Sequence, residues 1–277
     1  MPAASCPRGR PHMPTYFRSY CSSSAGNCLA LWTRDSSILI DCGVRTLRDT
    51  RALLQQHRAR RGDLHGVLVT HSHGDHVSKA ALRVLGEEEV VLHCHRDVAR
   101  QLRDRHENLA DTGVILQAFP DGSFTMGDFR VSAFALPHAP GIPTFGFAIR
   151  AGHGSDRRKI VVCTDFNDFS GVLPHLEDAD FVFVEANHDI GLLRRHPNPN
   201  SRYHLNNVKT AWLLAHAVRD GRRPPNRVVL GHLSEERNTA ELALDEVRRV
   251  FTIQRQAVAF RLQAAPRHEP SRTMKVV

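Results

Sequence analysis

The sequence predicts a four-layer α/β sandwich in a single domain, with two central sheets covered on their outer faces by helices. Strand-like and helix-like segments alternate along all 277 residues, and both halves are rich in strands and finish in helices. Neither an internal repeat nor a long linker divides the chain. We therefore expect one domain over residues 17–263, between a disordered N-terminal tail (1–16) and a loose, basic C-terminal tail (264–277).

The first half of the chain predicts five strands and three helices. The segments CLALWT and SILIDCG flank the turn-like RDS, a pattern that indicates a β-hairpin. GVLVT is a compact aliphatic run that indicates a strand. The expected strands are 28–33, 37–43, 66–70, 89–94 and 113–119, and the expected helices lie in 45–63, 79–85 and 96–106.

The second half predicts six strands and two helices. Residues 129–136 alternate apolar and polar side chains, as a half-exposed strand does. Residues 159–165 and 180–186 are nearly continuous apolar runs, which indicates strands that are buried on both faces. The other expected strands are 144–150, 227–232 and 257–263, and the expected helices lie near 206–218 and 238–251.

The composition is that of an ordinary globular protein, with 41% hydrophobic and 24% charged residues. No apolar run approaches the roughly 20 residues that cross a bilayer, which argues against an integral membrane protein. The first 16 residues lack the continuous apolar segment of a secretory signal. Six cysteines are scattered without a CxxC pair and are expected to be reduced thiols. We therefore expect a cytoplasmic protein.

The net charge of +8 and the pI near 9.6 suggest a nucleic-acid partner. Only four lysines occur, so the basicity is almost all arginine, and a GC-rich coding bias would produce the same excess. The stretch 45–63 concentrates this charge on one expected helix. Its residues Arg48, Arg51, Arg58 and Arg61 form either a phosphate-binding face or an ordinary solvated one.

The motif HSHGDH, which directly follows the aliphatic strand GVLVT, has four potential metal ligands in six residues. His71 and His73 lie two apart on an extended segment, so their side chains can point to the same side. Asp75 and His76 follow where the chain turns towards a helix, and their side chains can face a second metal position next to the first. One turn can thus hold two metal ions. Neutral imidazoles suit zinc, iron or manganese, and a carboxylate lowers the positive charge of the site.

Three further residues of ligand type stand directly after expected strands. His138 follows the strand 129–136, Asp165 ends 159–165, and His232 ends 227–232. The ends of strands in an α/β sheet are where active-site residues are presented. A dinuclear site needs ligands beyond one turn, and these three residues are its candidates.

Together these motifs make the chain resemble the metallo-β-lactamase-fold hydrolases, over roughly residues 17–263. Within them the chain is similar to the YycJ (WalJ) group, close to the tRNase Z and phosphonate-phosphodiesterase branches. The resemblance implies the αββα sandwich and a two-metal phosphodiesterase, most simply a nuclease acting on DNA or RNA through metal-activated water. The segments that carry it are SSSAGNC, SILIDCG, THSHGDH, PHAPGIPTFGF, TDFND, VEANHD and GHLSEERN.

The resemblance also implies a role for each residue of the expected site. One metal ion would be bound by three histidines and the other by two histidines and a carboxylate, with a second carboxylate as a bridge. Zinc is the expected ion, and manganese or iron is compatible. The first set is His71, His73 and His138, the second is Asp75, His76 and His232, the bridge is Asp165, and Asp41 braces the ligand loop.

The expected catalytic residues are Asp75, His204 and Glu185. YHLNN stands where related enzymes carry a histidine loop, so His204 is the candidate proton donor to the leaving oxygen, oriented by Glu185. The neighbours Tyr203 and Leu205 depart from the related pattern, and the alternative is a plain loop histidine.

Several further alternatives stay open from the sequence. His93 and His95 are expected to be structural, and His188 to lie behind the metal ligands. SSSAGN either packs against the metal loop or shapes a substrate groove. The chain could also be a small-molecule ester, lactone or cyclic-nucleotide hydrolase, or a metal-bound regulatory protein. Salt-sensitive polynucleotide binding would favour the nuclease, and bound metal without turnover would favour the regulatory protein.

Overall fold

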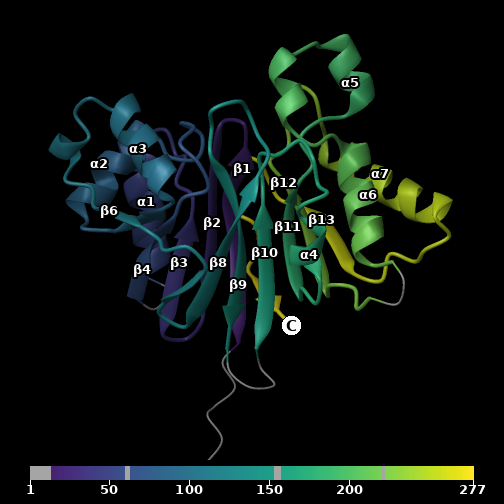
Figure 1. The fold of residues 1–277 in the computed structure, drawn as a ribbon, viewed down its shortest axis with the longest axis horizontal. Coiled ribbons are helices and arrows are strands. Elements are labelled where there is room, and N and C mark those ends of the chain that lie inside the picture. Colours follow the sequence, from purple (N-terminus) through teal and green to yellow (C-terminus); the bar gives the residue numbers. More distant parts are fainter. Residues whose placement is uncertain (1–13, 60–62, 153–156, 220–221) are drawn as a thin grey trace, which may run out of the picture.

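A computed structural model of the chain describes residues 14–59, 63–152, 157–219 and 222–277. Two seven-stranded sheets lie face to face, and helices cover the outer face of each sheet (Figure 1). Helices α1 to α3 cover the first sheet, and α6 and α7 cover the second. The predicted four-layer sandwich is therefore confirmed. None of the described helices combines the length and the apolar character that crossing a membrane requires.

The first sheet has the strand order β14-β1-β2-β3-β4-β5-β6. The predicted hairpin is present, with β2 and β3 antiparallel and Trp32 opposite Ser37. From β3 to β6 the strands run parallel. The elements of this half are β1 (Thr15–Ser23), β2 (Gly26–Trp32), β3 (Ser36–Ile40), α1 (Leu47–Arg58), β4 (Asp63–Leu68), α2 (Lys79–Glu87), β5 (Leu92–Cys94), α3 (Arg96–Arg105), β6 (Leu116–Ala118) and β14 (Met274–Val276).

The second sheet has the order β13-β12-β11-β10-β9-β8-β7. From β7 to β10 each strand is antiparallel to the one before it, and from β10 to β13 the strands run parallel. Its elements are β7 (Ser123–Met126), β8 (Phe129–Leu136), β9 (Thr144–Ala151), β10 (Arg158–Cys163), α4 (Leu173–Leu176), β11 (Phe181–Glu185), α5 (Ile190–Arg195), α6 (Asn207–Ala217), β12 (Arg227–Gly231), α7 (Ala240–Ile253) and β13 (Arg261–Ala264).

The continuous apolar runs arise because the inner strands are buried on both faces. In β11, Phe181 and Phe183 point between the two sheets, whereas Val182 and Val184 pack against the helices. Successive side chains of a strand point to opposite faces, so a strand in the middle of a four-layer sandwich has no solvent-facing position. By contrast, β8 alternates buried and exposed residues, as its sequence predicted.

The C-terminal segment differs from its prediction. Residues 264–277 were expected to be a loose tail, but Met274–Val276 form β14, which pairs antiparallel with β1 and places Val276 opposite Thr15. Met274 and Val276 are almost completely buried in the core between the sheets. The prediction was wrong because β1 has an edge that can pair with another strand, and burial of Met274 and Val276 is enough to hold β14 there. Of the expected N-terminal tail, residues 1–13 lie outside the described residues, and β1 begins at Thr15.

Candidate metal centre

The predicted site residues meet where strands of both sheets end. The loop with His71 to His76 follows β4 in the first sheet. In the second sheet, His138 follows β8, Asp165 follows β10, and His232 follows β12. The structure therefore brings together ligand-type residues that are up to 161 positions apart in the sequence, from His71 to His232.

Three strands that lead into the site end one to three residues earlier than the sequence predicted. β3 stops at Ile40, β10 at Cys163 and β12 at Gly231. Shortly afterwards, Asp41, Asp165 and His232 adopt a left-handed backbone, with φ of 59°, 60° and 53°. Residues other than glycine pay about 1–3 kcal/mol for such strain, which persists where the surrounding structure enforces it. Here it turns three polar side chains out of their strands and into one site.

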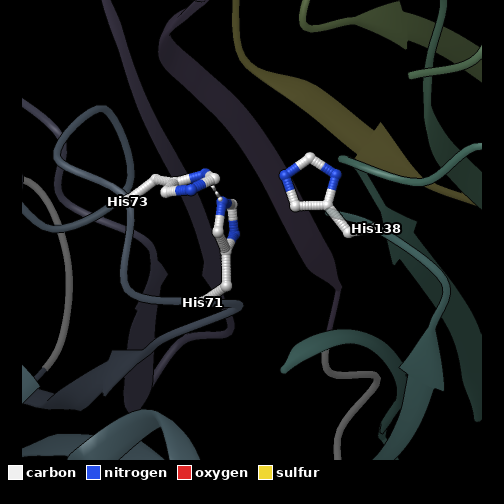
Figure 2. A group of neighbouring side chains, drawn as sticks. All are labelled: His71, His73 and His138. Atoms are coloured by element: carbon white, nitrogen blue, oxygen red, sulfur yellow. Dashed lines mark hydrogen bonds between the residues drawn. The ribbon is translucent and has the colours of Figure 1, made fainter. Parts of the chain in front are cut away.

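The first cluster consists of His71, His73 and His138, which offer ligand nitrogens within 4.8 Å of one another. Figure 2 shows His71 and His73 on one loop and His138 approaching from another part of the chain. The His71 Nε2 and His73 Nδ1 atoms are 2.9 Å apart. His138 donates from Nδ1 to the Tyr203 carbonyl at 3.0 Å, which leaves its buried Nε2 without a hydrogen-bond partner among the described residues.

The second cluster consists of Asp75, His76 and His232, whose ligand atoms also lie within 4.8 Å of one another. Asp75 Oδ2 is 3.5 Å from His76 Nε2 and 3.4 Å from His232 Nε2. His76 and His232 are buried, and Asp75 is partly exposed. This cluster therefore opens towards the surface through its carboxylate.

Asp165 lies between the two clusters. Its Oδ2 is 3.0 Å from His76 Nε2 and 3.6 Å from His232 Nε2, and its Oδ1 is 3.9 Å from His138 Nε2. Asp165 also forms a close group with His71 and His76. A single carboxylate thus reaches histidines of both clusters, which is the geometry that a shared ligand requires.

Asp41 holds His76 from behind. His76 Nδ1 donates to Asp41 Oδ2 at 2.7 Å, while the Thr70 amide and hydroxyl donate to the two oxygens of Asp41 at 2.8 and 2.9 Å. A proton on Nδ1 leaves Nε2 as the nitrogen that faces Asp75 and Asp165. This is how a carboxylate behind a metal-binding histidine selects its tautomer and fixes its ring.

The protonation states suit a metal centre. Burial lowers the pKa of His71, His73 and His138, which keeps these imidazoles neutral near pH 7. Although burial opposes it, neighbouring histidines hold the pKa of Asp75 and Asp165 well below its usual range, so both carboxylates are charged. Neutral imidazoles and ionised carboxylates are the forms that bind divalent metals.

A positive charge is favoured at the centre. Burial lowers the pKa of His76 and His232, but the carboxylate of Asp165 outweighs it and raises both. With the buried Nε2 of His138, which lacks a partner, these donors fit divalent ions of the zinc type.

His204 and Glu185 form a pair beside the clusters. His204 Nδ1 lies 3.0 Å from Glu185 Oε1 and 3.4 Å from Asp165 Oδ1. Glu185 is completely buried and also accepts from the Leu205 amide at 3.1 Å and from the Asp165 amide. Burial lowers the pKa of His204, but Glu185 and then Asp165 raise it to about 9 overall. The ring of His204 is therefore held by a buried carboxylate.

The SSSAGN segment packs against the ligand loops. The His232 amide donates to Ser22 Oγ at 2.8 Å, and the Asn27 amide donates to the Asp75 carbonyl at 2.8 Å. A Cβ at Gly26 would lie 2.9 Å from the Gly43 carbonyl oxygen, so this approach needs glycine. The tip of the segment, Ser24 and Ala25, also lines a cavity together with His204.

Two other histidines make contacts within the protein: His95, which was expected to be structural, and His188, which was expected to lie behind the metal ligands. His95 caps α3 by accepting from the Asp97 amide at 3.2 Å and stacks on Phe145 with the ring centroids 4.4 Å apart. His188 is buried, and its Nδ1 lies 3.3 Å from Asn187 Oδ1. Neither ring belongs to the ligand clusters found among the described residues.

The basic helix has acidic partners. Arg51 lies 2.6 Å from Glu87, and Arg58 pairs with Glu88, both at the end of α2. Arg61 lies outside the described residues. Arg51 and Arg58 therefore join α1 to the end of α2, which favours a solvated structural face over a phosphate-binding one for these two residues.

Comparison with known sequences gives one family and a small set of relatives. Residues 36–233 match the β-lactamase superfamily domain. Exodeoxyribonuclease YycJ of Bacillus anthracis is 28% identical over 249 residues, which cover 86% of this chain and 90% of that protein. Exodeoxyribonuclease WalJ of Streptococcus pneumoniae is 28% identical over 233 residues, covering 80% and 82%. These matches agree with the resemblance drawn from the motifs.

Solved structures share the fold at lower identity. The metallo-β-lactamase fold protein YhfI of Bacillus subtilis superposes with a TM-score of 0.69 at 19% identity, covering 95% of this chain and 99% of that one. The short form of human tRNase Z gives 0.62 at 17% identity, covering 95% and 99%. At these identities the similarity establishes the architecture alone.

Proposed function

The chain belongs to the β-lactamase superfamily domain family, and we propose that it is a dinuclear metal-dependent phosphodiesterase that degrades DNA. The observation that carries the proposal is the convergence of two ligand clusters on one carboxylate, Asp165, with the His204–Glu185 pair beside it. Two relatives named exodeoxyribonucleases, similar over most of their length, support DNA as the substrate.

Two zinc ions are the proposed cofactors. His71, His73 and His138 would hold one ion, and Asp75, His76 and His232 the other, with Asp165 shared between them. Asp41 would orient His76 through its Nδ1 proton. When bound, such ions lower the pKa of water and neutralise phosphate charge, which is the chemistry that phosphodiester hydrolysis needs.

The residues around the ions would complete the reaction. Because Glu185 accepts the Nδ1 proton of His204, the proton to be donated is held at Nε2. His204 Nε2 would protonate the sugar oxygen as it departs, which matters because an alkoxide is a poor leaving group. Glu185 would keep the ring in place through its bonds to His204 and the Leu205 amide.

The cytoplasm is the proposed compartment. Five described cysteines are free, including Cys28 and Cys42, which lie in the same buried cluster. Free thiols in this number are typical of a reducing environment.

The test is an assay of purified protein with end-labelled single- and double-stranded DNA and RNA, together with metal analysis. We expect progressive shortening of DNA from one end, its loss on chelation and its recovery with zinc. Preferential cleavage of RNA, or of small esters alone, would contradict the DNA assignment. Full metal content without turnover of any phosphodiester would contradict the hydrolase itself.

A further inference from the structure

Three cavities adjoin one another beside His204. The central cavity, of about 400 Å³, is lined by residues that include His204 and Arg45. The α6 cavity, of about 380 Å³, shares Asn198, Ser201 and His204 with it. The α1 cavity, of about 560 Å³, shares Ala25 and Arg45 with it. The three cavities therefore form one groove that passes His204.

This groove carries positive charge that the protein does not neutralise. Four of its cationic side chains have no carboxylate within 4 Å among the described residues: Arg45, Arg202, Lys209 and Arg267. The groove also has three acidic side chains: Glu236 pairs with Arg237 at 2.9 Å, Glu235 lies 3.3 Å from His268, and Asp49, in the α1 cavity, accepts from the Thr46 hydroxyl at 2.7 Å. Lys209 and Arg267 donate to the carbonyl oxygens of Asn167 and Ser234, at 2.7 and 2.8 Å, which engages their donors but leaves their charge in place.

Arg45 is the best placed of these cations. It lines both the central and the α1 cavity, and its side chain is exposed. Its guanidinium makes one weak bond, 3.4 Å to the Ser24 carbonyl oxygen. This contrasts with Arg51 and Arg58 on the following helix, which are tied to Glu87 and Glu88.

We propose that the groove holds a single polynucleotide strand and that Arg45 binds a phosphate of that strand beyond the one being cleaved. This proposal rests on the proposed function, and it names the form of the substrate. One cavity of about 400 Å³ is large enough for a small ligand. A row of three adjoining cavities that each contain a cationic side chain instead suits a ligand with several phosphates in succession, as in the positively charged grooves that bind single strands.

The polar lining supports recognition that does not depend on base sequence. Asn187, Asn198 and Asn200 line the central cavity and offer both donors and acceptors. The groove contains few aromatic side chains that could stack bases; Tyr20, in the α1 cavity, is almost completely buried. Binding would therefore come mainly from phosphate contacts, which makes it sensitive to salt.

The test compares Arg45→Ala and Arg45→Lys with Arg51→Ala and Arg58→Ala as controls. Each metal-loaded protein is assayed on bis(p-nitrophenyl) phosphate and on single-stranded DNA of about 2 to about 16 nucleotides, which includes the roughly 4 to 16 nucleotides that such grooves cover. In the wild type, kcat/KM should rise with DNA length. Arg45→Ala should lose about tenfold on the longer strands, as expected for one charged hydrogen bond, and much less on the small diester.

Two further readouts separate binding from structure. Arg45→Ala should flatten the dependence of log Kd on log salt by about 0.7 for one lost phosphate contact. Arg45→Lys should recover part of the affinity, because it keeps the charge. The α1 controls should keep the length dependence and the salt slope of the wild type.

The outcomes distinguish this proposal from the proposed function. Cleavage of the small diester without any gain from DNA length would overturn the groove and leave the phosphodiesterase intact. An equal loss on both substrates in Arg45→Ala would assign Arg45 to local structure and overturn its phosphate contact. If no phosphodiester is cleaved, the proposed function fails, and binding of a fluorescent DNA strand to wild type and Arg45→Ala then decides the groove. Tighter binding of duplex than of single strand would contradict the single-strand assignment.

Discussion

Glu185 Oε1 lies 3.0 Å from His204 Nδ1, while the other oxygen of Glu185 accepts from the Asp165 amide. One buried carboxylate thus holds both the candidate proton donor and the backbone of the residue that joins the two metal clusters. Since β11 ends at Glu185, the position of this carboxylate is set by the second sheet. The donor and the metal centre are therefore built on the same rigid support.

His204→Ala should separate proton donation from metal binding. We expect both metal ions to remain and the rate of DNA cleavage to fall by a factor of about 10² to 10⁴, which is the usual contribution of general-acid catalysis to a rate. A p-nitrophenyl diester should lose much less, because p-nitrophenolate departs without a proton. Equal losses on both substrates at full metal content would make His204 a residue that positions the substrate. Loss of metal would make it a ligand and reopen the assignment of His138 or His232.

Single ligand variants should deplete the two sites separately. His71→Ala removes a member of the cluster with His73 and His138, and Asp75→Ala removes a member of the cluster with His232. Elemental analysis of reconstituted protein should find two ions in the wild type and a preferential loss of one ion in each variant. One ion or none in the wild type would contradict the dinuclear centre. His95→Gln, at a helix cap outside these clusters, is the matched control.

Asp41→Asn should weaken metal binding without removing a ligand. Its Oδ2 accepts the Nδ1 proton of His76, and an amide nitrogen in that place would favour the wrong tautomer. Loss of such a partner costs about 10- to 100-fold in metal affinity. Competition with a chromophoric chelator would measure this change. Unchanged affinity would show that His76 is oriented by its packing alone, and Asp111→Asn, on the surface, serves as the control.

Met274→Ala should destabilise the fold although Met274 lies only three residues before the last residue, Val277. Met274 is 4% exposed and packs in the core between the sheets, where truncation of this side chain costs about 2–5 kcal/mol. Denaturant unfolding should show a lower free energy of unfolding than in Lys275→Ala, whose side chain faces solvent on the same strand. Equal stability of the two variants would mean that β14 is not part of the cooperative core.

Much of the fold could be predicted because the strands carry local signals. Buried runs such as VVC and FVFVE are too apolar for any position but an inner sheet, and their order along the chain matches a sandwich. The segment 15–23 was missed because its polar residues alternate irregularly. The strand 274–276 was missed because three residues carry no periodicity of their own, and its pairing with β1 depends on a contact across the whole chain.

The sequence by itself determined the chemistry of this protein: the residue types in HSHGDH, the strand-end residues His138, Asp165 and His232, and the family to which they point. Only the tertiary structure decided which side chains meet and which charges remain available. Arg51 and Arg45 look alike in the sequence, yet Arg51 is paired with Glu87 and Arg45 faces a groove. The reason is physical, since a ligand type is a property of one residue, whereas distance, burial and ion pairing depend on residues that the fold brings together from far apart in the chain.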